Sequence, residues 1–242
     1  MKLSAPIYRL KHRAKRLSRE EGIPLHVALD RIAAQEGFAS WSMLAAKLPE
    51  AAPGNIGLAA GLFQRLAPGD LLLLGARPGH GKTLMGLAIA VAAMRAGRRS
   101  MFFSLEYTER DMLDRFRSIG ASPAAFQDLF VFDSSDAICA DHIARRLDGC
   151  ARGTLAVVDY LQLLDQKRDT PPLDKQIRML EAFARERGVI FVFISQIDRR
   201  YDPSGKPCPD IGDVRLPNPL DMSLFGKTCF INAGKVAFRA AC

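Results

Sequence analysis

The stretch of sequence that decides the fold is Leu71-Leu-Leu-Leu-Gly-Ala76-Arg-Pro-Gly-His-Gly81-Lys82-Thr83. Its four consecutive leucines predict a buried strand, and the apolar residues after it predict a helix over Thr83–Ala96. A strand, a glycine-rich loop and a helix in this order point backbone N–H groups and the amino end of the helix at one anion. We therefore predict a phosphate-binding loop, with a simple glycine-rich turn as the alternative.

The residue types in this loop point to a nucleotide. The pattern is that of G-x-x-x-x-G-K-[ST], with Ala76 at the first glycine position. Lys82 is placed to reach the β- and γ-phosphates, and the Thr83 hydroxyl is placed to bind Mg²⁺. His80 is interpreted as a tolerated side chain rather than as an acid or base. The predicted nucleotide-binding residues are Ala76, Arg77, Pro78, Gly79, His80, Gly81, Lys82 and Thr83.

Strand and helix patterns alternate on the carboxyl side of this loop. Further strands are expected at Ser100–Leu105, Leu129–Phe132, Leu155–Val158 and Val189–Ile194, and one or two more within Leu224–Phe238. Helices are expected over Thr83–Ala96, from Thr108, over Ile138–Leu147 and over Lys175–Arg187. Continuous apolar strands separated by helices are typical of a mainly parallel sheet with helices on both faces. The predicted fold class is therefore α/β.

Three polar side chains follow predicted strands at the edge where ligands bind in open α/β sheets. Asp159 ends Ala156-Val-Val-Asp159 and is the candidate second ligand of Mg²⁺. Glu106 follows Ser100–Leu105 and is the candidate base that orients the attacking water. Gln196 ends the last of these strands and is the candidate γ-phosphate sensor. Each residue also has a structural alternative: a turn-capping Asp159, a solvated Glu106 and a hydrogen-bonded Gln196.

Taken together, these segments resemble the ATPase domain of DnaB-type replicative helicases, within the RecA-like superfamily. Besides the phosphate loop, the resemblance rests on Phe-Ser-Leu-Glu106, on Val-Val-Asp159-Tyr-Leu-Gln-Leu and on Ile-Ser-Gln196, and it covers about residues 56–232. It implies a RecA-like core, ATP with Mg²⁺, a ring or filament of identical subunits, and single-stranded DNA in a central channel. It also implies that Lys82, Glu106, Asp159 and Gln196 act in hydrolysis, with Gln196 coupling the ATP state to a DNA loop.

The sequence departs from the family pattern in three places. Residues 1–48 stand where the family has its amino-terminal helicase domain. The segment after Gln196 is rich in Pro, Asp and Gly, and its Arg199 and Arg200 are candidate contacts to the DNA backbone, with solvated surface as the alternative. The family's basic finger, which completes the ATP site of a neighbouring subunit, has only the unaligned candidates Lys235 and Arg239.

The amino-terminal region has a different character. Its apolar pattern predicts three short helices in a basic helical module over residues 1–48, followed by a Pro/Gly/Ala linker over 49–56 and the ATPase domain over 57–242. The chain has 242 residues and a net charge of +8. Residues 1–19 contain seven basic residues and no acidic one, so the charge excess lies in the first helix of this module. The module is a candidate surface for nucleic acid or an acidic protein partner.

Composition excludes several classes. No apolar run approaches the roughly 20 residues that span a bilayer, so we expect no membrane contact. The five cysteines are scattered without metal-binding spacing, which favours reduced thiols in the cytoplasm. The prediction is a Mg-ATP-dependent DNA helicase or ATPase. Two alternatives stay open: a nucleotide-binding adaptor or regulator with weak or no hydrolysis, and a RecA-like ATPase that does not bind DNA.

Overall fold

The computed structural model describes residues 4, 7–46, 56–165, 170–198, 200–202, 204–216 and 218–240. Contacts divide the chain into two compact units, Met1–Ala52 and Pro53–Cys242. No helix in the described ranges has both the length and the apolar character needed to cross a membrane.

The first unit contains three helices: α1 (Ile7–Glu21), α2 (Leu25–Gln35) and α3 (Trp41–Ala46). Gly22 and Gly37, both with positive φ, follow the first two helices and allow the chain to turn there. The apolar stripes predicted from the sequence meet in one small core, while Arg13, Arg16 and Arg19 of α1 are exposed. The buried residues of this core are Leu10, Ala14, Ala28, Leu29, Ile32, Ala33, Phe38, Trp41 and Leu44.

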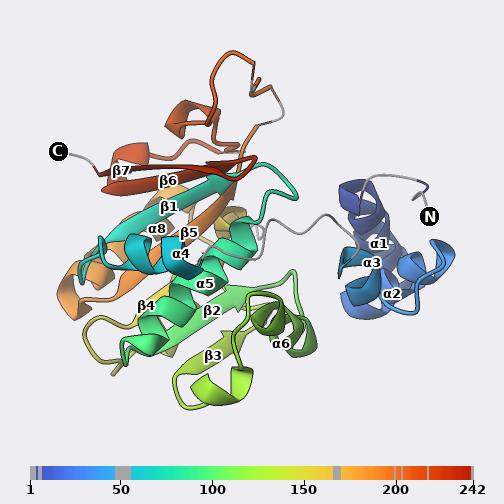
Figure 1. Cartoon of the computed structure of the whole chain (residues 1–242), viewed down its shortest axis with the longest axis horizontal. Helices are drawn as coiled ribbons and strands as arrows, with labels where there is room; N and C mark the ends of the chain where they lie inside the picture. The colour runs from blue at the N-terminus through green and yellow to red at the C-terminus, as the bar shows by residue number, and fades with distance from the viewer. Residues whose placement is uncertain are drawn as a thin grey trace. The chain divides into compact units, whose positions relative to one another are not determined.

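The second unit is built on one seven-stranded sheet in the order β3-β2-β4-β5-β1-β6-β7 (Figure 1). All neighbouring strands are parallel except β6 and β7, which form an antiparallel hairpin. The strands are β1 (Leu71–Ala76), β2 (Ser100–Ser104), β3 (Phe130–Asp133), β4 (Leu155–Asp159), β5 (Ile190–Gln196), β6 (Lys227–Asn232) and β7 (Lys235–Ala240).

Helices cover both faces of this sheet, because alternate residues of each central strand point to opposite sides. Leu72 and Leu74 of β1 pack with α4, α5 and α6, whereas Leu71 and Leu73 pack with α7 and α8. The helices are α4 (Ile56–Phe63), α5 (Lys82–Arg95), α6 (Glu109–Ser118), α7 (Ala140–Arg146) and α8 (Leu173–Arg187). The predicted α/β fold, with a mainly parallel sheet and helices on both faces, is confirmed.

Helix α5, which carries the end of the phosphate loop, lies unusually close to the sheet. A Cβ atom at Gly86 would stand 2.8 Å from Cδ1 of Ile194 and 3.2 Å from Cγ1 of Val157. Because Gly86 has no side chain, α5 can pack closely on β4 and β5, the two strands that end in Asp159 and Gln196. The position of the loop relative to those side chains is therefore set by core packing.

Most predicted helices and strands occur within two residues of their expected bounds, and the segment expected over Leu224–Phe238 forms β6 and β7. Helix α4 was not predicted. Its short sequence contains Gly57 and Gly61, which weaken any helical signal, and it is stabilised by packing on α5. Residues 49–55 of the expected linker lie outside the described residues, and Ile56 begins α4.

Candidate active site

The phosphate loop joins the end of β1 at Ala76 to the start of α5 at Lys82. Gly79 and Gly81 have φ angles of +83° and +77°, a region that L side chains rarely adopt. No atom lies within 4 Å of the place where a Cβ at Gly79 would stand. Gly81, the left-handed residue before α5, has no side chain and so does not cap the first N–H groups of the helix. Arg77 and Pro78 complete the loop.

Lys82 and Thr83, the first two residues of α5, are both buried. The Thr83 hydroxyl donates a hydrogen bond of 2.8 Å to Oδ2 of Asp159, the last residue of β4. Asp159 has no exposed surface. The structure thus brings together two residues that are 76 positions apart in the sequence.

The chemistry of this pair fits Mg²⁺. A hydroxyl and a carboxylate are hard oxygen donors, and Mg²⁺ commonly takes one or two such protein ligands together with phosphate oxygens and waters. Among the described residues there is no cluster of three or more His, Cys, Asp or Glu side chains that could hold a metal by themselves. Thr83 and Asp159 therefore match a metal shared with a nucleotide better than a closed protein cage.

Glu106 lies at the same edge of the sheet. It follows β2, whose last residue Ser104 pairs with Asp159 of β4. The Ser104 hydroxyl accepts a hydrogen bond of 3.1 Å from the Glu106 amide, so the chain turns sharply as it leaves the strand. The next residue, Tyr107, approaches Thr83 with its hydroxyl at 3.4 Å and lies under the Arg115 guanidinium.

Gln196 ends β5, which runs between β4 and β1, and it pairs with Ala76 in the sheet register. Asp159, Gln196 and the phosphate loop therefore leave three consecutive strands at their carboxyl ends. The strand order, which the sequence pattern did not specify, is what places these predicted residues along one edge.

The Pro-rich segment after Gln196 is folded back on itself. The Asp198 amide donates to the Asp213 carbonyl at 2.7 Å, and the Arg215 amide donates to the Gln196 carbonyl at 2.8 Å. We call residues 198–215 the β5 loop. Lys206 within it forms ion pairs with Asp210 at 2.8 Å and Asp213 at 2.6 Å. These contacts connect the described residues of the loop to one another.

The candidate DNA contacts in the β5 loop differ from one another. Arg199 lies outside the described residues. Arg200 is 92% exposed and approaches Asp198 at 3.3 Å, and Arg215 is exposed. Tyr201, the only aromatic residue of the loop, is buried, so it is not positioned as a stacking platform for a base.

Two residues near the site make contacts that had no signal in the sequence. Gln162, three residues after Asp159, donates through Nε2 to the Arg215 carbonyl at 2.6 Å and to the Ser195 hydroxyl at 3.3 Å. His80 of the phosphate loop accepts a hydrogen bond of 3.3 Å at Nδ1 from the Ala233 amide. Burial and the nearby Arg77 charge lower the pKa of His80, which favours the neutral ring that this contact requires.

The two basic-finger candidates lie at different positions along strand β7 of the β6–β7 hairpin. Lys235 begins β7 opposite Asn232, at the sheet edge that carries the phosphate loop, whereas Arg239 pairs with Thr228 farther back. Both are exposed.

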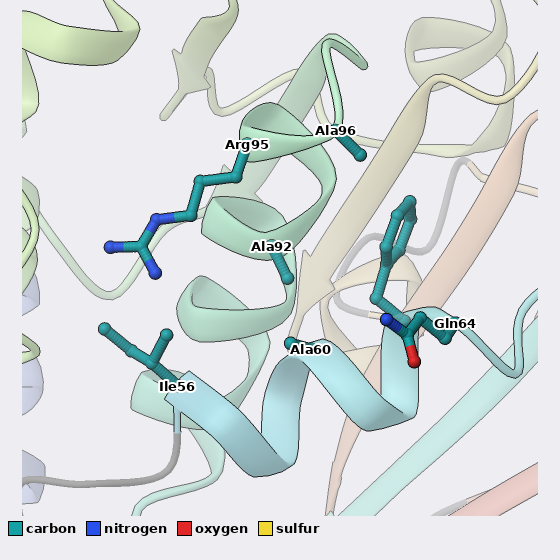
Figure 2. A pocket seen from close by; sticks show the side chains of 7 residues that line it. Ile56, Ala60, Gln64, Ala92, Arg95 and Ala96 are labelled. Carbon is teal, nitrogen blue, oxygen red and sulfur yellow. The ribbon is translucent and has the colours of Figure 1, made fainter.

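A separate hollow of about 270 Å³ lies between α4 and α5 (Figure 2). It is lined mainly by apolar side chains, at Ile56, Ala60, Phe63, Gln64, Ala92, Arg95 and Ala96. Ala92, Arg95 and Ala96 belong to the carboxyl end of α5 and the residue after it, whereas the phosphate loop adjoins the amino end. This hollow is therefore distinct from the candidate active site.

The strand order and the loop between β1 and α5 define a domain with a RecA-like α/β fold. Comparison with known proteins narrows this class. Residues 60–123 match the family model described as the DnaB-like helicase C terminal domain. The resemblance to the DnaB-type helicase ATPase domain, predicted from the motifs, is confirmed.

Named relatives agree with this match. The chain is 28% identical over 211 residues to a probable plasmid replicative DNA helicase of Chlamydia muridarum, covering 70% of this chain and 47% of that protein. It is 25% identical over 198 residues to the replicative DNA helicase DnaB of Mycoplasma genitalium, covering 65% and 42% respectively. The chain therefore spans less than half the length of these relatives.

Solved structures support the fold. One solved ATPase domain superimposes with a TM-score of 0.55 at 17% identity, covering 68% of this chain and 69% of that one. A DnaB-like replicative helicase, solved in a study of its interactions with primase, gives a TM-score of 0.58 at 17% identity, covering 92% of this chain and 64% of that one.

Proposed function

We propose that this protein binds and hydrolyses Mg-ATP and acts on single-stranded DNA as an oligomer of identical subunits. The observation that carries the proposal is the contact between Thr83 and Asp159, because it joins the phosphate loop to a buried carboxylate on a neighbouring strand. Similarity to replicative helicases supports DNA as the second ligand. Residues 1–48 are proposed to form a separate module that binds nucleic acid or a protein partner.

In this mechanism each residue has a separate task. The loop amides and Lys82 bind the β- and γ-phosphates, and Thr83 and Asp159 hold Mg²⁺. When bound, the metal ion neutralises charge that develops on the phosphate oxygens. Glu106 accepts a hydrogen bond from the attacking water and orients it toward the γ-phosphate. Gln196 senses the γ-phosphate and passes its state to the β5 loop, where Arg200 contacts the DNA backbone together with Arg199.

The test is ATP turnover with and without single-stranded DNA, in the wild type and in Lys82→Ala. We expect turnover that rises with DNA, and turnover near background in Lys82→Ala, because the loop amides alone cannot balance the phosphate charge. DNA binding should weaken as salt rises, since phosphate contacts release counterions. No turnover by the wild type, or undiminished turnover in Lys82→Ala, would remove the catalytic proposal.

The second candidate function is a nucleotide-controlled adaptor that hydrolyses ATP slowly. The observation that favours it is the β6–β7 turn, whose two residues, Ala233 and Gly234, carry no basic side chain. A missing finger lowers turnover by roughly 10³–10⁵ in systems that use one. Mass analysis of the ATP-bound species separates the two functions: an adaptor forms nucleotide-dependent oligomers but shows no DNA-stimulated turnover.

A further inference from the structure

The tight turn between β6 and β7 contacts both the phosphate loop and the β5 loop. The strand β6 pairs with β1 on the side opposite β5, with Ile231 beside Ala76. The turn that follows Asn232 therefore lies next to the loop that leaves β1, and Figure 1 shows the hairpin in red beside β1. Ala233 and Gly234 both have positive φ, +47° and +80°, so the turn holds the twist that a two-residue hairpin requires.

On one side, this turn meets the phosphate loop. The Ala233 amide donates to Nδ1 of His80, which stands between Gly79 and Gly81. A phosphate bound at those glycines would lie next to the backbone of His80, so its binding could shift His80 and this hydrogen bond. Because Ala233 has a backbone conformation that is unfavourable for a residue with a Cβ, the turn is held there by its surroundings.

On the other side, the turn meets the β5 loop through Asn232. This side chain is buried, and its Nδ2 donates to the Pro207 carbonyl at 3.0 Å and to the Tyr201 hydroxyl at 3.4 Å. Tyr201 in turn donates to the Lys206 carbonyl at 2.7 Å. A buried amide whose donors are both used fixes the position of the groups it binds.

Contacts within the β5 loop connect the segment that Asn232 binds to the two ends of the loop. Lys206 is bound to Asp210 and Asp213, and the Asp213 carbonyl accepts the Asp198 amide. The loop returns at Arg215 to the backbone of Gln196. If Tyr201 and Pro207 move, these contacts would therefore shift the two ends of the β5 loop, where the exposed Arg200 and Arg215 lie.

We propose that Asn232 is a positioning residue that, through the β6–β7 turn and His80, couples the nucleotide in the phosphate loop to the β5 loop. This inference rests on the proposed function and adds to it a second route, separate from Gln196. It implies that a nucleoside triphosphate bound at the phosphate loop changes the affinity of the protein for a polynucleotide backbone at the β5 loop. Binding of the polynucleotide then changes the affinity for the nucleotide in the same way. By linkage the two effects are equal in size.

Hydrogen–deuterium exchange tests this route without DNA or turnover. The wild type is measured with and without a non-hydrolysable Mg-ATP analogue, following peptides from residues 77–95 and from 198–216. We expect protection of the first segment, and a change of about 3- to 10-fold in the exchange of the second, the size expected for one hydrogen bond gained or lost.

Asn232→Leu keeps the volume of the side chain but removes both donors. In this variant we expect the phosphate-loop peptides to respond as in the wild type while the response at 198–216 falls below about twofold. Thr228→Val, a buried polar residue of the same strand, is the matched control and should keep both responses. Tyr201→Phe, which keeps the ring but loses the hydroxyl that Asn232 contacts, provides a second variant and should also weaken the response.

His80 gives a rescue experiment. His80→Leu removes the acceptor for the Ala233 amide, and His80→Asn keeps an acceptor oxygen near the place of Nδ1. Whatever these changes do to ATP affinity, we expect the β5-loop response at saturating nucleotide to be lost in the first and retained in the second.

The outcomes separate the two proposals. If the analogue protects residues 77–95 but leaves 198–216 unchanged in the wild type, the coupling route is wrong and ATP binding stands. An unaltered β5-loop response in folded Asn232→Leu and Tyr201→Phe also overturns the route. If residues 77–95 do not respond in the wild type, ATP binding itself is wrong, and the coupling route falls with it.

Discussion

Replacing Asp159 by Asn tests the metal site most directly. The change is isosteric, and Asn Oδ1 still accepts the 2.8 Å hydrogen bond from the Thr83 hydroxyl. The fold should therefore survive, with the free energy of unfolding altered by no more than about 1 kcal/mol, or roughly 2–4 °C in Tm for a chain of this size. The negative charge that would face Mg²⁺ is lost.

The expected catalytic effect is much larger than the effect on stability. A carboxylate that holds the metal supports charge stabilisation of several kcal/mol in the transition state. Losing about 3 kcal/mol of it lowers kcat by about 100-fold or more. The assay is steady-state ATP turnover at saturating Mg²⁺, with nucleotide affinity and thermal unfolding measured on the same preparation.

The matched control is Asp133→Asn. Asp133 is also a buried aspartate at the carboxyl end of a strand, but it ends the edge strand β3. It binds Arg146 at 2.8 Å and His142 at 3.1 Å. This variant should lose about 1–3 kcal/mol of stability, the range for hydrogen bonds to charged groups, with little change in turnover of the folded protein. Turnover of Asp159→Asn within tenfold of the wild type, or an equal fall in Asp133→Asn, would refute the assignment of Asp159.

Three further predictions follow from the packing, the ionisation and the two units. Gly86→Val should lower the free energy of unfolding by about 1–3 kcal/mol, because the valine side chain would collide with Ile194 beneath α5. Chemical denaturation measures this change, and an unchanged midpoint would contradict the close packing of α5 on the sheet. Burial alone would raise the pKa of Asp133, but hydrogen bonds from the Ser135 amide, His142 and Arg146 outweigh it and lower that pKa. The ionised Asp133 carboxylate therefore stabilises the fold fully above the unfolded pKa of about 3.9, and this stabilisation is lost as the pH falls through the lower pKa of the folded state. In denaturation measured at several pH values, the difference in stability between the wild type and Asp133→Asn should shrink below about pH 4. Deleting residues 1–48 should leave ATP turnover near the wild-type rate while weakening recruitment or DNA affinity, which turnover and salt-dependent DNA titration measure; loss of turnover in a folded deletion variant would argue against a separate module.

Much of the candidate site was accessible from the sequence because its signals are local. Gly79, Gly81, Lys82 and Thr83 form a loop whose conformation follows from neighbouring residues, and four leucines before it report a buried strand. Asp159 and Gln196 were predicted as site residues because each ends an apolar run, and parallel strands present their carboxyl ends at one edge.

Other features were not visible because they depend on contacts between distant segments. The Pro-rich sequence after Gln196 does not show that Tyr201 is buried or that Lys206 pairs with Asp210 and Asp213. In the sequence, Asn232 is simply a polar residue at the end of a predicted strand. Nothing near it in the sequence indicates that its side chain donates a hydrogen bond to the Pro207 carbonyl, 25 positions earlier. Helix α4 depends on its packing against α5.

The sequence by itself determined which residues are candidates for nucleotide chemistry, because strand, loop and helix propensities act over a few neighbouring residues. Only the tertiary structure decided which of these residues meet. The insertion of β5 between β4 and β1, and of β6 beside β1, brings Thr83 to Asp159 and places Asn232 between two loops. Apolar strands can bury both faces of the sheet in many different strand orders, so burial alone does not select one order. The polar contacts at the carboxyl edge of the sheet form in only a few of these orders, so they depend on the order that is adopted.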